Sequence, residues 1–267
     1  MHNTYMPTAV EILEIRRHTG TERSFTLDLK VPACPGQFVM VSLPHAGEAP
    51  IAISKFEADS IAITVRNVGK VTSGLFKLRS GDKLFLRGPY GQGFPLEVFE
   101  DQHLLIIAGG SGLAAVKPLV ENYLENNGEH RLKQLDVLTG FRSVKHVLFR
   151  AELKRWNKNC DVVVTVDTCE DEAESWAGGI GFVVNFIKEV KNIGPDTFAI
   201  VAGPPLMMNN SVRELLRHQA REERIWLSFE RHMKCGVGKC GRCRIRDKYV
   251  CVDGPVFNYV EARELID

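Results

Sequence analysis

Four cysteines near the carboxyl end most strongly limit what this 267-residue chain can fold into. Three are spaced C-x4-C-x2-C, and the fourth follows after seven intervening residues. This spacing is typical of the thiolates that hold a plant-type [2Fe–2S] cluster. Glycines lie between them, and glycine lets a loop adopt left-handed backbone and pass close to a cluster. We therefore predict a cluster with the metal ligands Cys235, Cys240, Cys243 and Cys251.

A structural zinc site is the alternative, because zinc is also held by four thiolates. Such sites usually contain two separate C-x2-C pairs, and this segment contains one. A disulfide framework is least favoured, since seven cysteines leave an odd thiol and no signal pattern marks the chain as secreted. We expect a cytoplasmic location, with Cys34, Cys160 and Cys169 as ordinary thiols.

The overall charge excludes a general attraction to nucleic acid, because the formal net charge is only +1. No apolar run is long enough to span a bilayer. Residues 229–253 are locally basic, with seven basic and three acidic side chains, a net charge of +4. These charges either neutralise an anionic cluster or dock a partner with an acidic face, and both interpretations stay open.

The first third of the chain predicts short strands. Apolar and polar residues alternate over 24–31, 61–66 and 83–87, and 37–43 is more continuously apolar. Glycine and proline turns separate these runs. Regularly spaced short strands with turn signals predict a small antiparallel barrel.

The pattern then changes to alternating strands and helices. Strands are predicted over 103–108, 134–139, 161–166, 198–202 and 225–228, and helices over 113–127, 145–156, 181–190 and 205–221. This order predicts a parallel, doubly wound sheet with right-handed crossovers. The predicted domains are therefore the barrel at 1–100, the α/β domain at 101–228 and the cysteine segment at 229–267.

Three glycines, Gly109, Gly110 and Gly112, lie between the first strand and first helix of the α/β half. A dinucleotide pyrophosphate meets a helix N-terminus at this place. The run does not match G-x-G-x-x-G, and a plain tight turn is the alternative. Gly203 and Pro204 follow the fourth strand and leave room for a flat ring, although proline in a first helical turn is also common.

A weaker phosphate signal lies in the barrel half at Gly69, Lys70 and Thr72, where a short helix over 73–78 is predicted to start. A threonine N-cap is the alternative. No Ser/His/Asp triad or paired carboxylates stand out, so no catalytic side chain is predicted.

The barrel, the α/β half and the cysteine tail together resemble the ferredoxin–NADP reductase superfamily. The tail from Ser228 to Phe257 is similar to its iron–sulfur branch, which holds the dihydroorotate dehydrogenase electron-transfer subunit, the sulfhydrogenase gamma subunit and a subunit of anaerobic sulfite reductase. Gly47-Glu-Ala-Pro-Ile and Asp253-Gly-Pro-Val-Phe-Asn-Tyr look most like the last of these.

The resemblance implies a flavin-binding barrel carrying FAD, an NAD(P)-binding α/β domain and a small C-terminal [2Fe–2S] loop. It carries over residues that would line the isoalloxazine, namely Pro50, Ile51, Ala52, Ile53 and Ser54. It places another group at the FAD pyrophosphate, namely Gly69, Lys70, Val71 and Thr72. A third group would face NADH or NADPH, namely Gly109, Gly110, Gly112, Gly203, Pro204 and Met207.

The flavin strand departs from the family pattern. Ala49 and Ala52 stand where the family has the arginine and the serine of an Arg-x-x-Ser motif, so both the arginine and the hydroxyl are missing. Ser54 is expected to substitute in part, and FMN in place of FAD stays open. Ala115 stands where the family has proline, and Pro118 follows three residues later. Arg142 is the candidate contact for a 2′-phosphate, although the resemblance favours NADH.

These features predict an oxidoreductase subunit that takes hydride from NAD(P)H and passes single electrons to a partner. The expected partners are the catalytic and iron–sulfur subunits of a hetero-oligomeric complex, first an anaerobic sulfite reductase, and alternatively a sulfhydrogenase or a dihydroorotate dehydrogenase. A regulatory subunit that binds flavin or metal without turnover is a further alternative, favoured by Ala49 and Ala52.

Overall fold

The computed structural model describes residues 5–125, 131–169 and 176–265. The chain divides into two compact units. The barrel unit combines Met1–Phe94 with Glu230–Pro255, and the α/β unit combines Pro95–Phe229 with Val256–Asp267. By packing, the cysteine segment Glu230–Pro255 thus belongs with the barrel. The predicted three-part division by cofactor stays a prediction.

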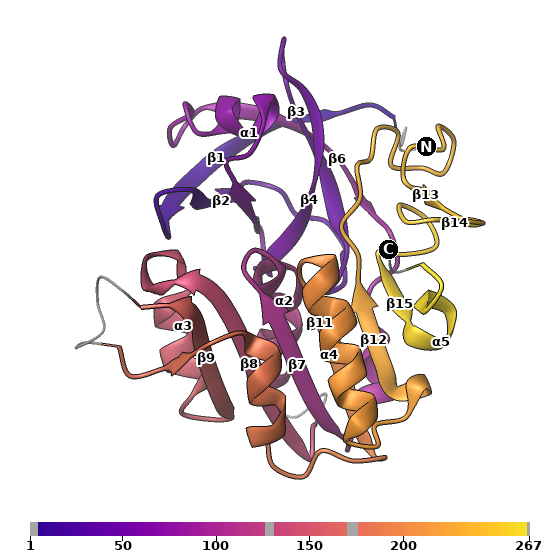
Figure 1. Ribbon diagram of the computed structural model, residues 1–267. Helices are drawn as coiled ribbons and strands as arrows, with labels where there is room; N and C mark the ends of the chain where they lie inside the picture. The colour runs from indigo at the N-terminus through magenta and orange to yellow at the C-terminus, as the bar shows by residue number, and fades with distance from the viewer. Residues whose placement is uncertain (1–4, 126–130, 170–175, 266–267) are drawn as a thin grey trace. The chain divides into compact units, whose positions relative to one another are not determined.

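The barrel unit is built from six antiparallel strands closed in the order β1-β2-β5-β4-β3-β6 (Figure 1). They are β1 (Thr8–Arg17), β2 (Glu22–Leu27), β3 (Phe38–Leu43), β4 (Gly47–Phe56), β5 (Ile61–Arg66) and β6 (Lys83–Tyr90). Alternate side chains such as Phe25, Val41 and Ile63 fill its interior. A register shift between Ile12 and Glu14 interrupts the alternation in β1. The predicted antiparallel barrel is confirmed.

The helix α1 (Lys70–Leu75) begins three residues earlier than predicted. Gly69 occupies the N-cap position, so Thr72 lies inside the first turn and is not the N-cap. Its hydroxyl still accepts hydrogen bonds from the backbone N–H groups of Val68 and Gly69, at 3.0 and 2.9 Å. The threonine therefore stabilises the helix start from within.

The α/β unit contains a seven-stranded sheet in the order β10-β9-β8-β7-β11-β12-β15. The strands are β7 (His103–Gly109), β8 (Gln134–Ser143), β9 (Asp161–Thr168), β10 (Gly179–Ile180), β11 (Thr197–Ala202), β12 (Ile225–Ser228) and β15 (Val256–Asn258). All neighbours are parallel except β15, which pairs antiparallel with β12. The predicted doubly wound sheet is confirmed, with β10 and β15 as additional short strands.

The longer helices of the described residues pack against this sheet. They are α2 (Gly112–Glu125), α3 (Arg150–Trp156), α4 (Pro205–Arg217) and η3 (Val183–Glu189). Arg155 of α3 pairs with Glu121 of α2 at 2.8 Å, which joins these two helices. η3 packs against α4, which lies in front of the strands in Figure 1.

The helix boundaries differ from the predictions for local reasons. The predicted helix over 145–156 is divided into η2 (Val144–His146) and α3, because Phe149 adopts a left-handed φ of 52°. The helix predicted to 221 ends at Arg217, and Gln219 has a φ of 64°. The helix predicted over 181–190 is the 3-10 helix η3. Residues 126–127 of the predicted helix over 113–127 lie outside the described residues.

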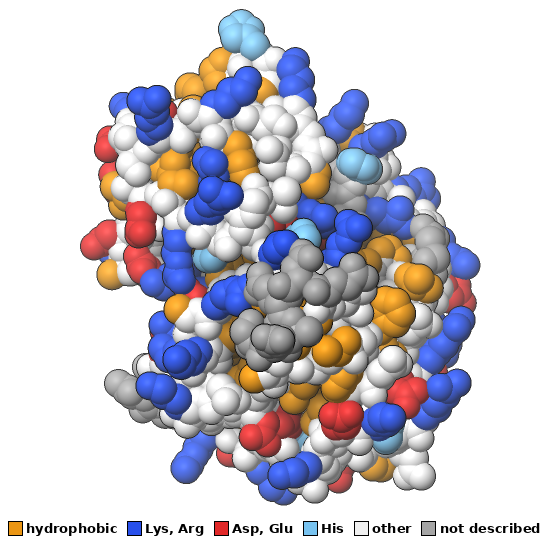
Figure 2. All heavy atoms as spheres, turned by 60° about the vertical axis from the view of Figure 1, so that its left-hand side comes forward, with side chains coloured by type: hydrophobic (Ala, Val, Ile, Leu, Met, Phe, Trp, Pro, Cys, Tyr) orange, Lys and Arg blue, Asp and Glu red, His pale blue; other side chains and the backbone are white. Residues whose placement is uncertain are grey.

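The remaining elements are short. They are η1 (Leu96–Phe99), η4 (Glu222–Arg224), β13 (Arg244–Ile245), β14 (Lys248–Tyr249) and α5 (Tyr259–Ala262). Within the described ranges, no helix is both long and apolar enough to cross a membrane. On the face shown in Figure 2, acidic side chains lie among the Lys and Arg side chains, in keeping with the net charge of +1.

Candidate functional site

The cysteine segment follows β12 and contains glycines in backbone conformations that other residues rarely adopt. Gly236, Gly238 and Gly241 have φ values of +74°, +71° and +72°. A Cβ at Gly236 would lie 3.1 Å from the ring of Tyr90 and 3.3 Å from Met40. The segment therefore passes so close to the barrel strands that only glycine fits there.

Backbone N–H groups surround the first sulfur of this segment. The N–H groups of Lys239 and Cys240 both donate to Cys235 Sγ at 3.4 Å. Burial raises the pKa of Cys235, but these N–H groups and that of Val237 outweigh it and lower the pKa to about 6. Donors aimed at a sulfur in this way stabilise a thiolate, which is the form that binds metal.

The fourth thiol lies near others of the set. Burial raises the pKa of Cys251 to about 12, and the neighbouring Cys243 and Cys235 add to that rise. Cys251 Sγ also accepts a hydrogen bond from the N–H of Gly238 at 3.2 Å. The segment therefore brings its first and last cysteines close enough to interact.

The number and spacing of the four cysteines fit a two-iron cluster. Zinc would require four ligands around one point. A [2Fe–2S] centre instead distributes four thiolates over two irons. The donor set and its N–H groups therefore suit the predicted cluster.

Basic side chains border the exposed part of this segment. Cys240 is exposed, whereas Cys243 and Cys251 are buried. Lys239 and Arg242, also exposed, flank Cys240. The Lys239 ammonium lies 5.1 Å from the Tyr5 ring, and the Arg244 guanidinium lies 5.9 Å from the Tyr249 ring. The most exposed sulfur therefore lies within a positively charged rim.

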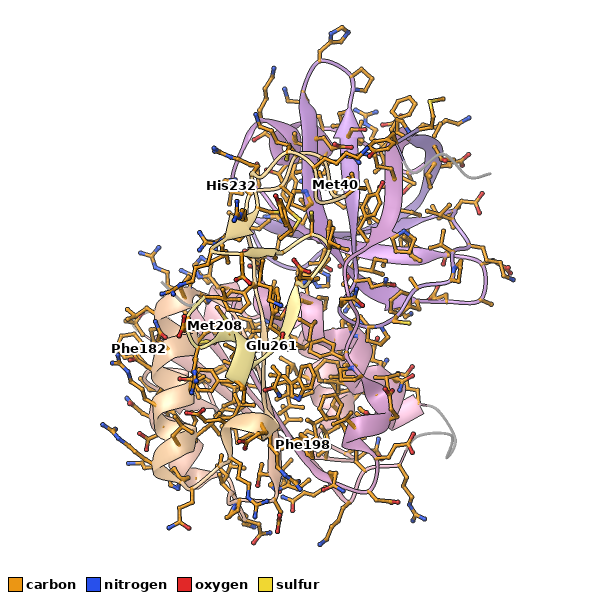
Figure 3. The ribbon with its side chains drawn as sticks, turned by 90° about the vertical axis from the view of Figure 1, so that its right-hand side faces the viewer. Met40, Phe182, Phe198, Met208, His232 and Glu261 are labelled. Carbon is orange, nitrogen blue, oxygen red and sulfur yellow. The ribbon has the colours of Figure 1, made fainter. Side chains whose placement is uncertain are left out.

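Strands β4, β3 and β6 form one outer face of the barrel. Met40 of β3 lies opposite Pro50 of β4 on one side and opposite Arg87 of β6 on the other. Its neighbours Val39 and Val41 belong to the barrel core. Because successive side chains of a strand alternate, Met40 (labelled in Figure 3) and Pro50 face outward. The predicted flavin-lining Pro50 is thus one strand away from the row that meets the cysteine segment.

The remaining predicted flavin residues divide between the two faces of β4. Ala52 pairs with Phe38 in the outward row, whereas Ile51 packs partly against the core and Ile53 lies in it. Ser54 is 2% exposed, and its hydroxyl contacts the Thr64 hydroxyl at 2.7 Å. Ile63 and Val65 belong to the barrel core, so Thr64 and the Ser54 hydroxyl bound to it lie on the outward side of the sheet. The substitution of Ser54 for the hydroxyl missing at position 52 stays a prediction.

An ion pair that sequence reasoning missed joins the same strands. Arg87 donates to both carboxylate oxygens of Glu48, at 2.6 and 2.5 Å. It also donates to the carbonyl oxygens of Lys234, at 2.8 Å, and of Cys235. The hydrogen bond to Glu48 raises the pKa of Arg87 above its ordinary value, so the guanidinium stays charged. Glu48 lies in the Gly47-Glu-Ala-Pro-Ile run, but nothing in that run indicates that its partner is Arg87.

The predicted pyrophosphate residues lie at the start of α1. Gly69 and Lys70 are exposed, Val71 is half-buried and Thr72 is buried. The Thr72 hydroxyl donates to the Gly69 carbonyl at 3.0 Å, in addition to the hydrogen bonds it accepts. That hydroxyl is therefore used within the turn, and the exposed Lys70 side chain is the cation offered to solvent.

The structure brings the predicted nicotinamide residues together at the carboxyl ends of β7 and β11. These strands are adjacent and parallel, with Ala108 opposite Ala202. A Cβ at Gly112 would lie 2.5 Å from the Ala202 carbonyl oxygen, and one at Gly109 would lie 2.4 Å from Met207 Sδ. The loops after both strands therefore meet through residues without side chains.

The remaining members of this group lie in the same place. Gly110 has a φ of +54°, and no atom lies within 4 Å of a Cβ built on it. A Cβ at Gly203 would lie 3.1 Å from the backbone nitrogen of Gly109, and Pro204 precedes α4 as its N-cap. The result is a sheet edge lined by backbone, at the position where doubly wound sheets bind dinucleotides.

Arg142 lies at the end of β8, next to the end of β9. The Thr168 hydroxyl donates to the Arg142 carbonyl at 3.5 Å. Burial raises the pKa of Asp167, and the neighbouring Arg142 guanidinium opposes that rise. An acidic and a basic side chain therefore share the edge where a ribose 2′ substituent would be recognised.

Comparisons with known proteins agree with this geometry. Residues 230–262 match the iron–sulfur cluster binding domain of dihydroorotate dehydrogenase B, and residues 106–213 match the oxidoreductase NAD-binding domain. The predicted iron–sulfur and NAD-binding parts are thereby confirmed as domain types. The individual site residues stay predictions.

Full-length relatives are also similar. The sulfhydrogenase 2 gamma subunit of Pyrococcus furiosus is 32% identical, over 97% of this chain and 97% of that relative. A probable dihydroorotate dehydrogenase B (NAD(+)) electron-transfer subunit of Methanocaldococcus jannaschii is 33% identical, over 94% of this chain and 89% of the relative.

A solved structure of an NADH-dependent reduced ferredoxin-NADP oxidoreductase shares the fold, with a TM-score of 0.77 at 23% identity over 100% of this chain and 94% of that one. The resemblance inferred from the tail is confirmed. The chain belongs to the NAD-binding, iron–sulfur family that includes the sulfhydrogenase gamma subunits and the dihydroorotate dehydrogenase B electron-transfer subunits.

Proposed function

We propose that this chain is an electron-transfer subunit that oxidises NADH or NADPH and delivers electrons to a partner through FAD and a [2Fe–2S] cluster. The observation that carries the proposal is the packing of the four-cysteine segment against strands β3 and β6 of the barrel, where β3 pairs with the predicted flavin strand β4. When bound, the flavin accepts a two-electron hydride and releases electrons singly, and the cluster accepts one electron at a time.

The residues of the α/β unit bind and orient the nucleotide in this proposal. Gly109, Gly112 and Gly203 keep the two loops in backbone contact, so a flat nicotinamide has room beside them. Met207 lies against Gly109, and its flexible thioether can move to admit the ring. No proton transfer by a side chain is required, because hydride chemistry belongs to the cofactors.

The residues of the barrel unit hold the flavin and the cluster. Pro50 and Ala52 offer a flat, small outer surface for the isoalloxazine, and Lys70 offers a cation for the phosphates. Cys235 with Cys240 would hold one iron, and Cys243 with Cys251 the other. The N–H groups directed at the sulfurs of Cys235 and Cys251 would tune the reduction potential of the bound cluster.

The partner is proposed to be the catalytic and iron–sulfur subunits of an anaerobic sulfite reductase, in the cytoplasm. Gly47–Ile51 and Asp253–Tyr259 support this choice by resemblance. A sulfhydrogenase complex is the second candidate, because the gamma subunit from Pyrococcus furiosus matches 97% of this chain. In either complex, the basic rim at Lys239 and Arg242 would face an acidic surface of the partner.

Absorption and EPR spectroscopy of anaerobically purified protein test the proposal, followed by titration with NADH and then NADPH. We expect flavin and [2Fe–2S] signals in one sample, bleaching of the flavin by stoichiometric nucleotide and then reduction of the cluster. Zinc in place of iron would indicate a structural module. Flavin and iron without any reduction by either nucleotide would indicate a regulatory subunit, and both results would contradict the proposal.

A further inference from the structure

Both ends of the cysteine segment are tied to the barrel, by different means. After Cys251 the tie is made by Gln92, whose N–H donates to the Gly254 carbonyl at 2.6 Å and whose side chain donates to the Val252 carbonyl at 3.1 Å. Before Cys235 the tie is made by Arg87, which donates to the carbonyl oxygens of Lys234 and Cys235. The side chain of Arg87 is only 8% exposed.

Arg87 is itself held in a defined position. Its guanidinium forms a bidentate pair with Glu48, whose side chain is 24% exposed. The guanidinium carbon also lies 5.6 Å from the centre of the Tyr90 ring. A planar fork with five donors can serve a carboxylate and two carbonyls together, and an ammonium group cannot reproduce that arrangement.

The pair spans three strands. Glu48 lies on β4, Arg87 on β6, and Met40 on the strand between them. Glu48 and Pro50 are two residues apart on β4, so their side chains share a face. The same ion pair therefore contacts the predicted flavin strand at one end and the peptide of the first cysteine at the other.

We propose that Arg87 is a positioning residue that fixes the Cys235 end of the cysteine segment relative to the flavin strand, and whose charge tunes the cluster. This inference rests on the proposed function. It concerns an arginine outside the predicted nucleotide and flavin residues, and it identifies Glu48 as the group that orients it.

The charge predicts opposite effects for the two members of the pair. Reduction adds a negative charge to the cluster, so nearby positive charge favours the reduced form and negative charge opposes it. Arg87→Met should lower the midpoint potential of the cluster, and Glu48→Gln should raise it. A purely mechanical role for the pair would not give shifts of opposite sign.

The geometry predicts a separate effect on cluster retention. Removing an outer-shell partner of a metal site typically costs roughly 10–100-fold in metal affinity or activity. Arg87→Met should therefore lose iron to a chelator roughly 10–100-fold faster than the wild type. Arg87→Lys keeps the charge but not the fork, so it should nearly retain the potential and still lose iron faster.

A matched control comes from the same barrel. Arg23 donates to the Phe76 carbonyl at 3.0 Å and lies 4.5 Å from the centre of that ring, but it does not contact the cysteine segment. Arg23→Met removes the same kind of contacts at another place. It should leave the midpoint potential, the EPR spectrum and the rate of iron loss unchanged.

The experiment uses full-length protein purified anaerobically, with EPR-monitored redox titration and chelator challenge of the wild type and all four variants. Shifts of the same sign for Arg87→Met and Glu48→Gln, no shift in either, or equal effects of Arg23→Met and Arg87→Met would overturn the inference. If Arg87→Met does not fold, Glu48→Gln and Arg87→Lys decide it. A wild-type protein without a cluster contradicts the proposed function, whereas a normal wild type with unshifted variants contradicts this inference alone.

Discussion

Gly112→Ala should weaken nucleotide binding more than a glycine-to-alanine substitution at any other position in the first turn of the α/β unit. The new Cβ would lie 2.5 Å from the Ala202 carbonyl oxygen, 2.7 Å from its carbon and 2.9 Å from Gly203 Cα. Ordinary contact begins near 3.4 Å, so the two loops must separate by about 0.9 Å. All three neighbouring atoms are backbone, which cannot rotate away.

The surroundings resist that separation. Ala202 is held in β11 by rungs to Ala108 and Ser228, and Leu113 of α2 is fully buried. Overpacking costs about 1–3 kcal/mol, and we expect the upper part of that range. This cost lowers the free energy of unfolding. Separately, we expect the displaced loops to weaken NAD+ binding by about 10–100-fold, which corresponds to about 1.4–2.8 kcal/mol.

Calorimetric titration with NAD+ avoids turnover and measures the effect directly, and urea unfolding measures the stability loss. Gly194→Ala is the control, because it precedes β11 at the opposite edge of the sheet and a Cβ there meets no atom within 4 Å. An unchanged affinity and unfolding midpoint in Gly112→Ala would refute the argument that these loops meet through backbone.

Three further predictions concern charge and reactivity. Replacing Lys239 and Arg242 by Glu should slow the NADH-dependent reduction of the anion ferricyanide roughly tenfold and speed the reduction of the cation hexaammineruthenium. Equal changes in the two rates would argue against electrostatic steering. Asp167→Asn should raise the ratio of kcat/KM for NADPH to kcat/KM for NADH about fivefold, which corresponds to about 1 kcal/mol between exposed charges. An unchanged ratio would show that Asp167 does not influence the choice of coenzyme. Burial raises the pKa of Cys160 to about 12, so at pH 8 iodoacetamide should alkylate it about a thousandfold more slowly than an ordinary thiol, and its reactivity should rise as the pH approaches that value. Peptide mass spectrometry measures the rate against the exposed Cys34, and equal rates for the two cysteines would contradict the raised pKa.

Local patterns predicted the parts of this fold that depend on local physics. Alternation over 61–66 predicted β5 with its observed bounds, and the order of strands and helices predicted the doubly wound sheet. The helix errors arose where single residues such as Phe149 and Gln219 take left-handed backbone without being glycine. No periodic pattern marks such positions.

The sequence predicted the parts of the site that residue spacing indicates. It did not predict the parts that depend on contacts between residues far apart in the chain. The cysteine spacing and the glycine turns are local signals. The pair of Glu48 and Arg87 joins residues 39 apart, and Arg87 meets Cys235 across 148 residues. The contact between the Ser54 and Thr64 hydroxyls, which joins two neighbouring strands, is another example. Such relations follow from strand register, which the sequence pattern does not specify.

The final strand has a consequence for how the protein is made. Ser228 and Val256 lie opposite one another on one rung of the sheet, so the chain leaves the sheet and re-enters it at a single point. During translation the outer edge of β12 therefore remains unpaired until the ribosome has synthesised all four cysteines. A message truncated before Val256 would yield a chain with a bare sheet edge, which invites aggregation. A chain in which β15 has paired with β12 therefore already contains all four predicted iron ligands.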